Sequence, residues 1–211
     1  ISLGESEDTV LEIVQRKGKS LEGIPGLCYR GEDGKAAYGP PRKRIMDLDR
    51  LPLPAYDRLD FSVYTQPMIM TTRGCPYGCP FCSVGQFWGK TVAFRSAESV
   101  ADEIKMLEDT YGTRSIFFAD PTFVLNKKRI FEMCKHIRDR KLKSALKFFG
   151  RFDLMDDDLM DEMAQSNFNF VFFGMETGSQ DILPKIKKGF TVDSALETIQ
   201  RAKKYFDKIE A

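Results

Sequence analysis

Short apolar runs of strand length alternate with amphipathic helical stretches over the larger, C-terminal part of the chain. Residues 115–119 form one unbroken apolar run, whereas residues 97–111 place Val100, Ile104 and Leu107 on a single helical stripe. Unbroken apolar strands are typical of parallel sheets that helices cover. The alternation therefore predicts βα units joined into a parallel α/β fold.

Four such units can be distinguished. The predicted strands and the helices that follow them span residues 68–72 and 97–111, 115–119 and 127–140, 146–149 and 157–165, and 170–173 and 192–206. A short helical piece is expected after Ser179. Because the chain ends about where a fifth strand should begin, residues 170–173 are expected to lie at the edge of an open parallel sheet. An exposed edge strand is a template for pairing, so we expect self-association there.

Residues 1–66 precede the predicted core at 67–211 and lack its alternation of apolar strands and amphipathic helices. A helix is expected over 7–17, where apolar residues share one face. Strands at 27–30 and 35–38 flank a Gly-Glu-Asp-Gly turn, which predicts a hairpin. The prolines that follow oppose helix and central strand, so this part is expected to be a small helix and hairpin followed by an extended connector.

Composition excludes several classes of protein. Lys and Arg number 32 and Asp and Glu 31, for a net charge of +1, so bulk charge predicts no nucleic-acid binding. No apolar run approaches the roughly 20 residues of a membrane helix, and the acidic start does not resemble a signal peptide. We therefore expect a cytoplasmic protein that does not associate with membranes. The missing initiator Met favours a piece of a longer protein.

Three of the five cysteines lie in one short loop after the first predicted strand. Cys75, Cys79 and Cys82 are separated by three and then two residues, and the glycines and prolines between them oppose helix. Strand ends of βα folds are where chemistry is placed. The spacing predicts a metal centre, whereas the isolated Cys28 and Cys134 are expected to be ordinary buried or half-buried thiols.

The number of ligands distinguishes two kinds of metal centre. A structural zinc site takes four ligands, but His136 is the only histidine and falls within a predicted helix. A four-iron cluster held by three cysteines keeps one iron open. The sequence favours an iron–sulfur centre, with a structural zinc site as the alternative.

The Cys-x3-Cys-x2-Cys spacing after a first strand, with Phe81 before the third cysteine, resembles the radical S-adenosylmethionine superfamily. The resemblance implies that Cys75, Cys79 and Cys82 hold a [4Fe–4S] cluster, on a barrel of six units of which about four are present. S-adenosylmethionine would chelate the fourth iron. One electron, from a donor such as flavodoxin or ferredoxin, would then release a 5′-deoxyadenosyl radical that attacks the substrate.

Three stretches of residues 1–66 are similar to the connector of radical enzymes that carry a cobalamin-binding domain. They are Gly-Glu-Ser-Glu at 4–7, Gly-Ile-Pro-Gly-Leu at 23–27 and Met-Asp-Leu-Asp-Arg-Leu-Pro-Leu-Pro at 46–54. Members of this subgroup resemble methyltransferases and the anaerobic magnesium-protoporphyrin cyclase. The resemblance implies that residues 1–66 connect an absent cobalamin-binding domain to a radical core at 67–211 that is truncated at its C-terminus. The full-length protein would bind cobalamin.

The superfamily resemblance also implies S-adenosylmethionine contacts at the other strand ends. Asp120 and Thr122 follow the second strand, with an Asp-Pro turn as the alternative reading. Arg151 follows the third strand and could contact the ribose or carboxylate, or pair with Asp153 at the surface.

Glu176, after the fourth strand, falls in a segment that resembles the ribose-contacting segment, and a carboxylate can accept two hydroxyl hydrogen bonds. Lys188 is the choice for the methionine carboxylate, with Lys185 second, and a solvated helix end is the alternative for both. Phe81 is expected to pack near adenine, unless it is simply a core residue.

Three functions are consistent with these residues. The first is a cobalamin-dependent radical S-adenosylmethionine enzyme, and the second is a related enzyme without cobalamin, such as a methylthiotransferase. The third is a metal-stabilised interaction module without catalysis. The substrate cannot be read from this sequence.

Overall fold

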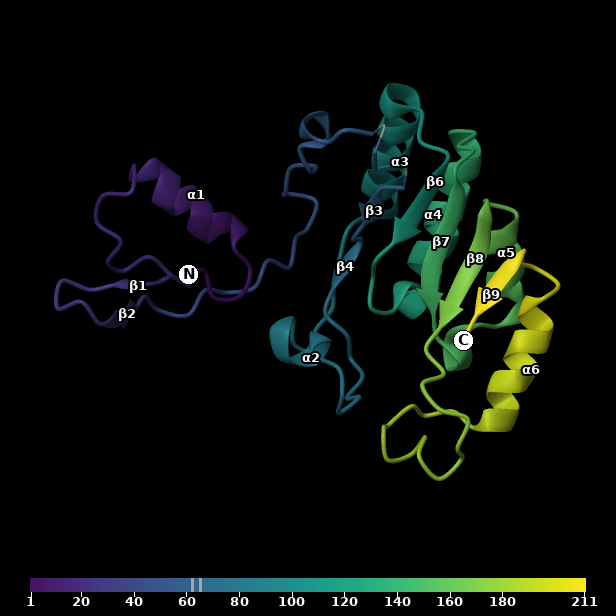
Figure 1. Cartoon of the computed structure of the whole chain (residues 1–211). Coiled ribbons are helices and arrows are strands. Elements are labelled where there is room, and N and C mark those ends of the chain that lie inside the picture. The colour runs from purple at the N-terminus through teal and green to yellow at the C-terminus, as the bar shows by residue number, and fades with distance from the viewer. Residues whose placement is uncertain (62, 65) are drawn as a thin grey trace. The chain divides into compact units, whose positions relative to one another are not determined.

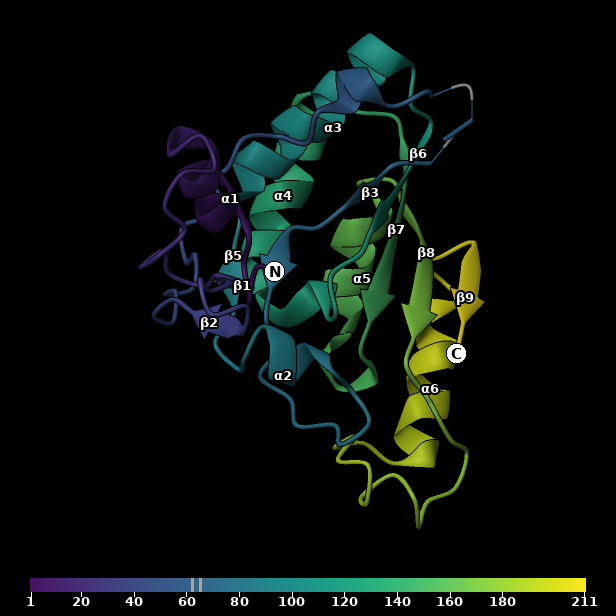
Figure 2. The same cartoon turned by 60° about the vertical axis from the view of Figure 1, so that its left-hand side comes forward.

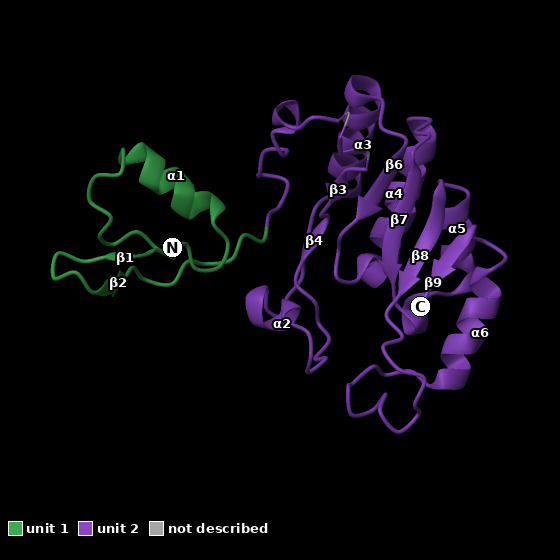
Figure 3. Cartoon of the chain, viewed as in Figure 1, with its two compact units in different colours: residues 1–46 green, residues 47–211 purple. Residues whose placement is uncertain are grey.

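The computed structural model describes residues 1–61, 63–64 and 66–211. The chain divides into two compact units, Ile1–Met46 and Asp47–Ala211 (Figure 3). None of the described helices is long and apolar enough to cross a membrane.

The smaller unit contains helix α1 (Glu7–Gln15) and the antiparallel strands β1 (Cys28–Arg30) and β2 (Ala36–Tyr38). The predicted helix and hairpin are therefore confirmed, with the helix ending two residues early. Arg42 ties the helix to the following segment, because its guanidinium lies 2.6 Å from a Glu12 carboxylate oxygen.

The larger unit begins well before residue 67. Residues 47–61 are largely irregular, apart from the short 3-10 helix Tyr56–Arg58. The buried Tyr56 hydroxyl donates a hydrogen bond of 2.6 Å to Glu103 on helix α3 (Ala97–Tyr111). This hydrogen bond attaches the segment before residue 67 to the core. The assignment of residues 1–66 as a connector remains a prediction.

The core is a five-stranded parallel sheet in the order β3-β6-β7-β8-β9 (Figure 1). The strands are β3 (Met68–Ile69), β6 (Ser115–Phe118), β7 (Ala145–Gly150), β8 (Phe168–Phe173) and β9 (Lys208–Glu210). Helices α3, α4 (Lys127–Asp139), α5 (Asp157–Ala164) and α6 (Val192–Ala202) connect them on one face (Figure 2). This confirms the predicted partial parallel barrel, as an open sheet.

Side chains alternate between the two faces of this sheet. Ile116 and Phe118 of β6 are fully buried in the core shared with the helices. On the opposite face, Phe117, Phe149 and Phe172 meet with ring centroids 5.0–5.6 Å apart. Phe149 remains 37% exposed, so this face carries an open aromatic cluster.

The expectation that the fourth strand is an edge is wrong. β9 pairs in parallel with β8, with Val171 opposite Ile209, and so β9 is the edge of the sheet. The sequence Lys-Ile-Glu of β9 has one apolar residue, so there is no apolar run from which this strand could be predicted. Self-association through the β8 edge loses its basis.

Two further details differ from the predicted elements. The first strand splits into β3 and β4 (Thr72–Arg73), and β4 pairs with the unpredicted strand β5 (Ala93–Phe94). The segment after Ser179 forms turns rather than a regular helix. A short helix α2 (Val84–Phe87) lies between β4 and β5.

Candidate functional site

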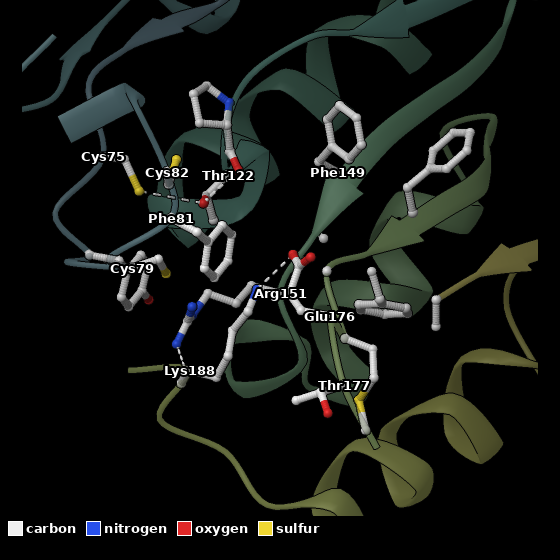
Figure 4. A pocket seen from close by; sticks show the side chains of 18 of the residues that line it. Cys75, Cys79, Phe81, Cys82, Thr122, Phe149, Arg151, Glu176, Thr177 and Lys188 are labelled. Atoms are coloured by element: carbon white, nitrogen blue, oxygen red, sulfur yellow. Dashed lines mark hydrogen bonds and ion pairs between the residues drawn. The ribbon is translucent and has the colours of Figure 1, made fainter. Parts of the chain in front are cut away.

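A cavity of about 760 Å³ lies at the carboxyl ends of β6, β7 and β8, beneath the cysteine loop (Figure 4). The loop lines it with Cys75, Tyr77, Cys79, Phe81 and Cys82. The rest of the lining comes from residues 121–122, 149–151, 172–178, 188 and 210–211. The lining thus joins six segments of the chain, from the cysteine loop to the last two residues.

The antiparallel pair β4–β5 carries the cysteine loop. Gly74, with φ of 111°, lies where an added Cβ would come 2.4 Å from the Thr91 carbonyl oxygen, so only glycine fits. The Cys75 N–H donates to the Gly89 carbonyl, and the Cys82 N–H to that of Cys79. The loop is therefore closed at its base and turned back on itself between the second and third cysteines.

All three loop thiols are half-buried and free, and all line the same cavity. They also line a second cavity of about 330 Å³, together with Lys90 and Lys187. Within the described ranges, no three His, Cys, Asp or Glu side chains are close enough together to bind a metal ion. The thiols fit an iron–sulfur cluster by the chemistry of their donor set, because such clusters are held by cysteine thiolates.

Glu176 and Lys188 form an ion pair in the cavity wall. Lys188 Nζ lies 3.0 Å from Glu176 Oε1, and the lysine side chain is only 8% exposed. A Cβ on Gly174 would lie 2.9 Å from Glu176 Oε1 and 3.1 Å from Lys188 Nζ. The sequence predicted a role for each charge separately, and the structure brings both together beside a glycine that leaves them room.

Arg151 lines the cavity next to Lys188 and contacts the cysteine loop. Its guanidinium lies 3.6 Å from the centre of the Tyr77 ring, and its Nε 2.7 Å from Asp153 Oδ1. Its Nη2 also donates to the Lys188 carbonyl oxygen. Burial raises the pKa of the Tyr77 hydroxyl, with the Asp153 charge adding to the effect. Arg151 thus lines the cavity and also makes the ion pair that was its alternative role.

Phe81 lies at the mouth of the cavity and is 56% exposed, with Lys188 Nζ 5.6 Å from its ring centre. It is not a core residue. Trp88 lies outside this lining, where Arg73 stacks 5.0 Å from its ring centre and Phe87 packs edge-on.

Lys185, the second choice for the methionine carboxylate, is exposed and does not line the cavity. Asp120 does not line it either. It is completely buried and accepts hydrogen bonds from the Thr71 N–H, the Thr71 hydroxyl and the Thr72 hydroxyl. Burial raises the pKa of its carboxyl, against the hydrogen bonds and the charge of Arg129. Thr122, two residues on, does line the cavity, and its hydroxyl lies 3.9 Å from Cys75 Sγ.

Sequence reasoning missed Tyr77, Arg129 and the two threonines. Tyr77 lies in the cysteine loop, between Cys75 and Cys79, and this position was the sequence signal that could have marked it. Arg129 and Thr71 belong to ordinary helix and strand patterns, and so nothing in the sequence marks them.

A partial parallel (β/α) barrel with three cysteines on the loop after its first strand is the arrangement that the sequence resemblance implied for a protein that binds an iron–sulfur cluster. Residues 69–210 match the radical SAM superfamily, and the chain belongs to that superfamily. Membership implies a [4Fe–4S] cluster and S-adenosylmethionine as cofactors.

Several curated proteins resemble nearly the whole chain. An uncharacterized methyltransferase of Pyrococcus horikoshii is 36% identical over 96% of this chain and 45% of its own length. A putative methylthiotransferase of Methanocaldococcus jannaschii is 30% identical over the same shares. The anaerobic magnesium-protoporphyrin IX monomethyl ester cyclase of Rubrivivax gelatinosus is 28% identical over 95% of this chain and 38% of its own. The chain spans somewhat less than half the length of these relatives.

Two solved structures share the fold. The cobalamin-dependent S-adenosylmethionine radical enzyme OxsB, with aqua-cobalamin bound, gives a TM-score of 0.84 at 20% identity over 98% of this chain and 32% of its own. The radical S-adenosylmethionine methyltransferase TsrM of Kitasatospora setae gives 0.81 at 20% identity, over 100% of this chain and 45% of its own. The fold of both units is therefore one found in cobalamin-dependent radical enzymes.

Proposed function

We propose that this chain is the cluster-binding and S-adenosylmethionine-binding part of a cobalamin-dependent radical methyltransferase. One observation carries the proposal: the three loop cysteines and the Glu176–Lys188 pair, from opposite sides of the sheet's carboxyl end, line one cavity. An open cluster iron needs a polar ligand site beside it, and this cavity has one.

Cys75, Cys79 and Cys82 would hold the cluster, since they are the three free thiols on one loop facing the cavity. The cluster supplies the single electron that cleaves S-adenosylmethionine. The residues of the chain bind and orient the reactant and restrict water, as proteins do for cofactors that carry the chemistry.

The charges in the wall suit the polar groups of S-adenosylmethionine. Lys188 can pair with the methionine carboxylate, and Glu176 can accept hydrogen bonds from the ribose hydroxyls. Both partners leave their mutual ion pair when the ligand enters, so the buried Lys188 ammonium and the more exposed Glu176 carboxylate each gain a new partner as they lose the old one. Phe81, exposed at the mouth, offers an apolar face to adenine.

Methyl transfer with cobalamin is favoured over methylthio transfer by the connector motifs and by the fold shared with two cobalamin-dependent enzymes. The likeness to a putative methylthiotransferase keeps the second function as the alternative. The two differ in one measurable property, which is whether the full-length gene product binds cobalamin.

The proposal is tested by anaerobic reconstitution with iron and sulfide. The expected result is about four irons per chain, and 5′-deoxyadenosine formation by the full-length protein after chemical reduction. Cobalamin-dependent methylation of a substrate would then separate the two functions. Zinc in place of iron, with no 5′-deoxyadenosine, would contradict the proposal and favour the interaction module.

A further inference from the structure

The buried carboxylate of Asp120 is bonded to one short stretch of chain. The Thr71 N–H donates to Oδ1 at 2.8 Å, the Thr72 hydroxyl to Oδ1 at 2.7 Å and the Thr71 hydroxyl to Oδ2 at 3.0 Å. Thr71 and Thr72 are themselves completely buried. They lead directly through Arg73 and Gly74 into Cys75, so this carboxylate is attached to the start of the cysteine loop.

Helix α4 holds the same stretch from the other side. Arg129 donates from Nη2 to the Thr71 carbonyl oxygen at 3.4 Å and from Nε to the Arg95 carbonyl oxygen at 2.6 Å. The Arg95 N–H donates to the Thr71 carbonyl at 2.9 Å. Every polar group of Thr71 is therefore bonded, and three separate segments meet at this one residue.

The turn that carries Asp120 also reaches the first cysteine. Thr122 places its hydroxyl 3.9 Å from Cys75 Sγ and is fixed by donating to the Pro121 carbonyl at 2.8 Å. The Asp-Pro-Thr turn thus contacts the chain before the loop through Asp120 and the first thiol through Thr122, the latter contact being drawn in Figure 4. A rigid turn suits this task because proline restricts its backbone.

Burying a carboxylate costs free energy unless its oxygens accept hydrogen bonds. The hydrogen bonds of Asp120 come from Thr71 and Thr72, neither of which lines the cavity. Arg129 is the nearby opposite charge, and it is 6% exposed. Desolvation lowers the pKa of its guanidinium to about 10, against the charge of Asp120. The two charges together therefore add support to a segment whose regular pairing is only the two-residue ladder of β4 with β5.

We propose that Asp120, with Arg129, is a positioning residue that fixes residues 71–73 and so presents the cysteine loop for cluster binding. It acts through Thr71 and Thr72 and does not itself touch a cofactor. The positioning of the loop is a property of the chain alone, and only its purpose rests on the proposed function.

The first test uses the metal-free full chain and measures amide hydrogen exchange at residues 71–75 and the alkylation rate of Cys75. Asp120→Asn and Thr72→Val should each speed both by about tenfold, as expected for losing a bond to a buried charged group. Glu108→Gln is the matched control, because Glu108 accepts from the Lys143 and Ser144 N–H groups at the opposite end of the strands. Unchanged exchange and alkylation in both variants would overturn the proposal.

The second test follows reconstitution. Thr72→Val should release iron to a chelator several-fold faster and alter the paramagnetic resonance spectrum of the reduced cluster. Ser144→Ala, which removes a buried hydroxyl bond of 3.1 Å at the far end of β7, should change neither. Equal effects of the two variants would reduce Asp120 to a general contribution to stability and refute positioning. If the wild-type chain binds no cluster, the proposed function fails, and the exchange experiment still decides the role of Asp120.

Discussion

Lys188 Nζ lies 3.0 Å from Glu176 Oε1, and most of the eleven residues between them form turns that bring the two side chains together. Glu176 has a positive φ of 64°, which a non-glycine residue rarely adopts. A strained residue that places its carboxylate against a buried ammonium in a cavity wall is typical of functional sites. Under the proposed function, we expect S-adenosylmethionine to separate this ion pair when it binds.

Glu176→Gln should weaken S-adenosylmethionine binding to the cluster-loaded full-length protein by about 1–3 kcal/mol, because a charged hydrogen-bond acceptor is lost. Iron content should stay unchanged, since the cysteines lie on another strand's loop. Isothermal titration and iron analysis measure the two quantities. Glu197→Gln on α6, outside this cavity, is the control. Equal affinity in wild type and Glu176→Gln would assign Glu176 to structure alone.

Gly174→Ala should separate the same ion pair without removing a charge. The new methyl group would press on both Glu176 Oε1 and Lys188 Nζ, so S-adenosylmethionine affinity should fall several-fold while iron binding is retained. Ser144→Ala is the control, because Ser144 lies outside the cavity lining. If the two alanine variants bind S-adenosylmethionine equally, the geometry of the pair does not matter for the ligand.

Single substitutions of the five cysteines separate ligands from ordinary thiols. Replacing Cys75, Cys79 or Cys82 with Ala should abolish stable iron binding after reconstitution, because a cluster on two cysteines lacks a third anchor. Cys28→Ala should leave iron content at the wild-type level, since Cys28 lies in β1 of the other compact unit. Iron loss in Cys28→Ala matching that of the loop variants would contradict the three-ligand assignment.

Helical spacing and unbroken apolar runs were enough to predict α3 to α6 and the strands β6 to β8 within a few residues. β9 was missed because its three residues include one apolar side chain, and β4 and β5 because two-residue strands leave no periodic pattern. Strands as short as these are defined by their pairing with a neighbouring strand, and that neighbour is present only in the folded chain.

The site divides in the same way. The cysteine loop was predictable because its ligands are neighbours in sequence. The burial of Asp120 was not, because its partners Thr71 and Thr72 are 49 and 48 residues away. A strand-end aspartate reads as a ligand contact from sequence alone, and only packing shows that its carboxylate faces the core.

The last prediction concerns Cys134, which is completely buried on α4. Burial raises the pKa of its thiol from the ordinary 9.0 to about 12, only partly opposed by a hydrogen bond with Ser166. Above pH 9 the unfolded chain loses this proton while the folded chain keeps it, so the unfolded state binds fewer protons. The Cys134 contribution to stability is thus complete below pH 9 and is lost as pH rises toward 12, by about 1.4 kcal/mol per pH unit at most.

Cys134→Ala should therefore be less stable at pH 8, because of the cavity it leaves, yet lose stability less steeply between pH 9 and 10.5. Urea unfolding of the metal-free, reduced protein at several pH values measures both effects. Ser144→Ala, which removes a buried hydroxyl that does not titrate in this range, should keep the wild-type slope. Parallel pH profiles for wild type and Cys134→Ala would show that the folded protein does not protect this thiol from ionisation.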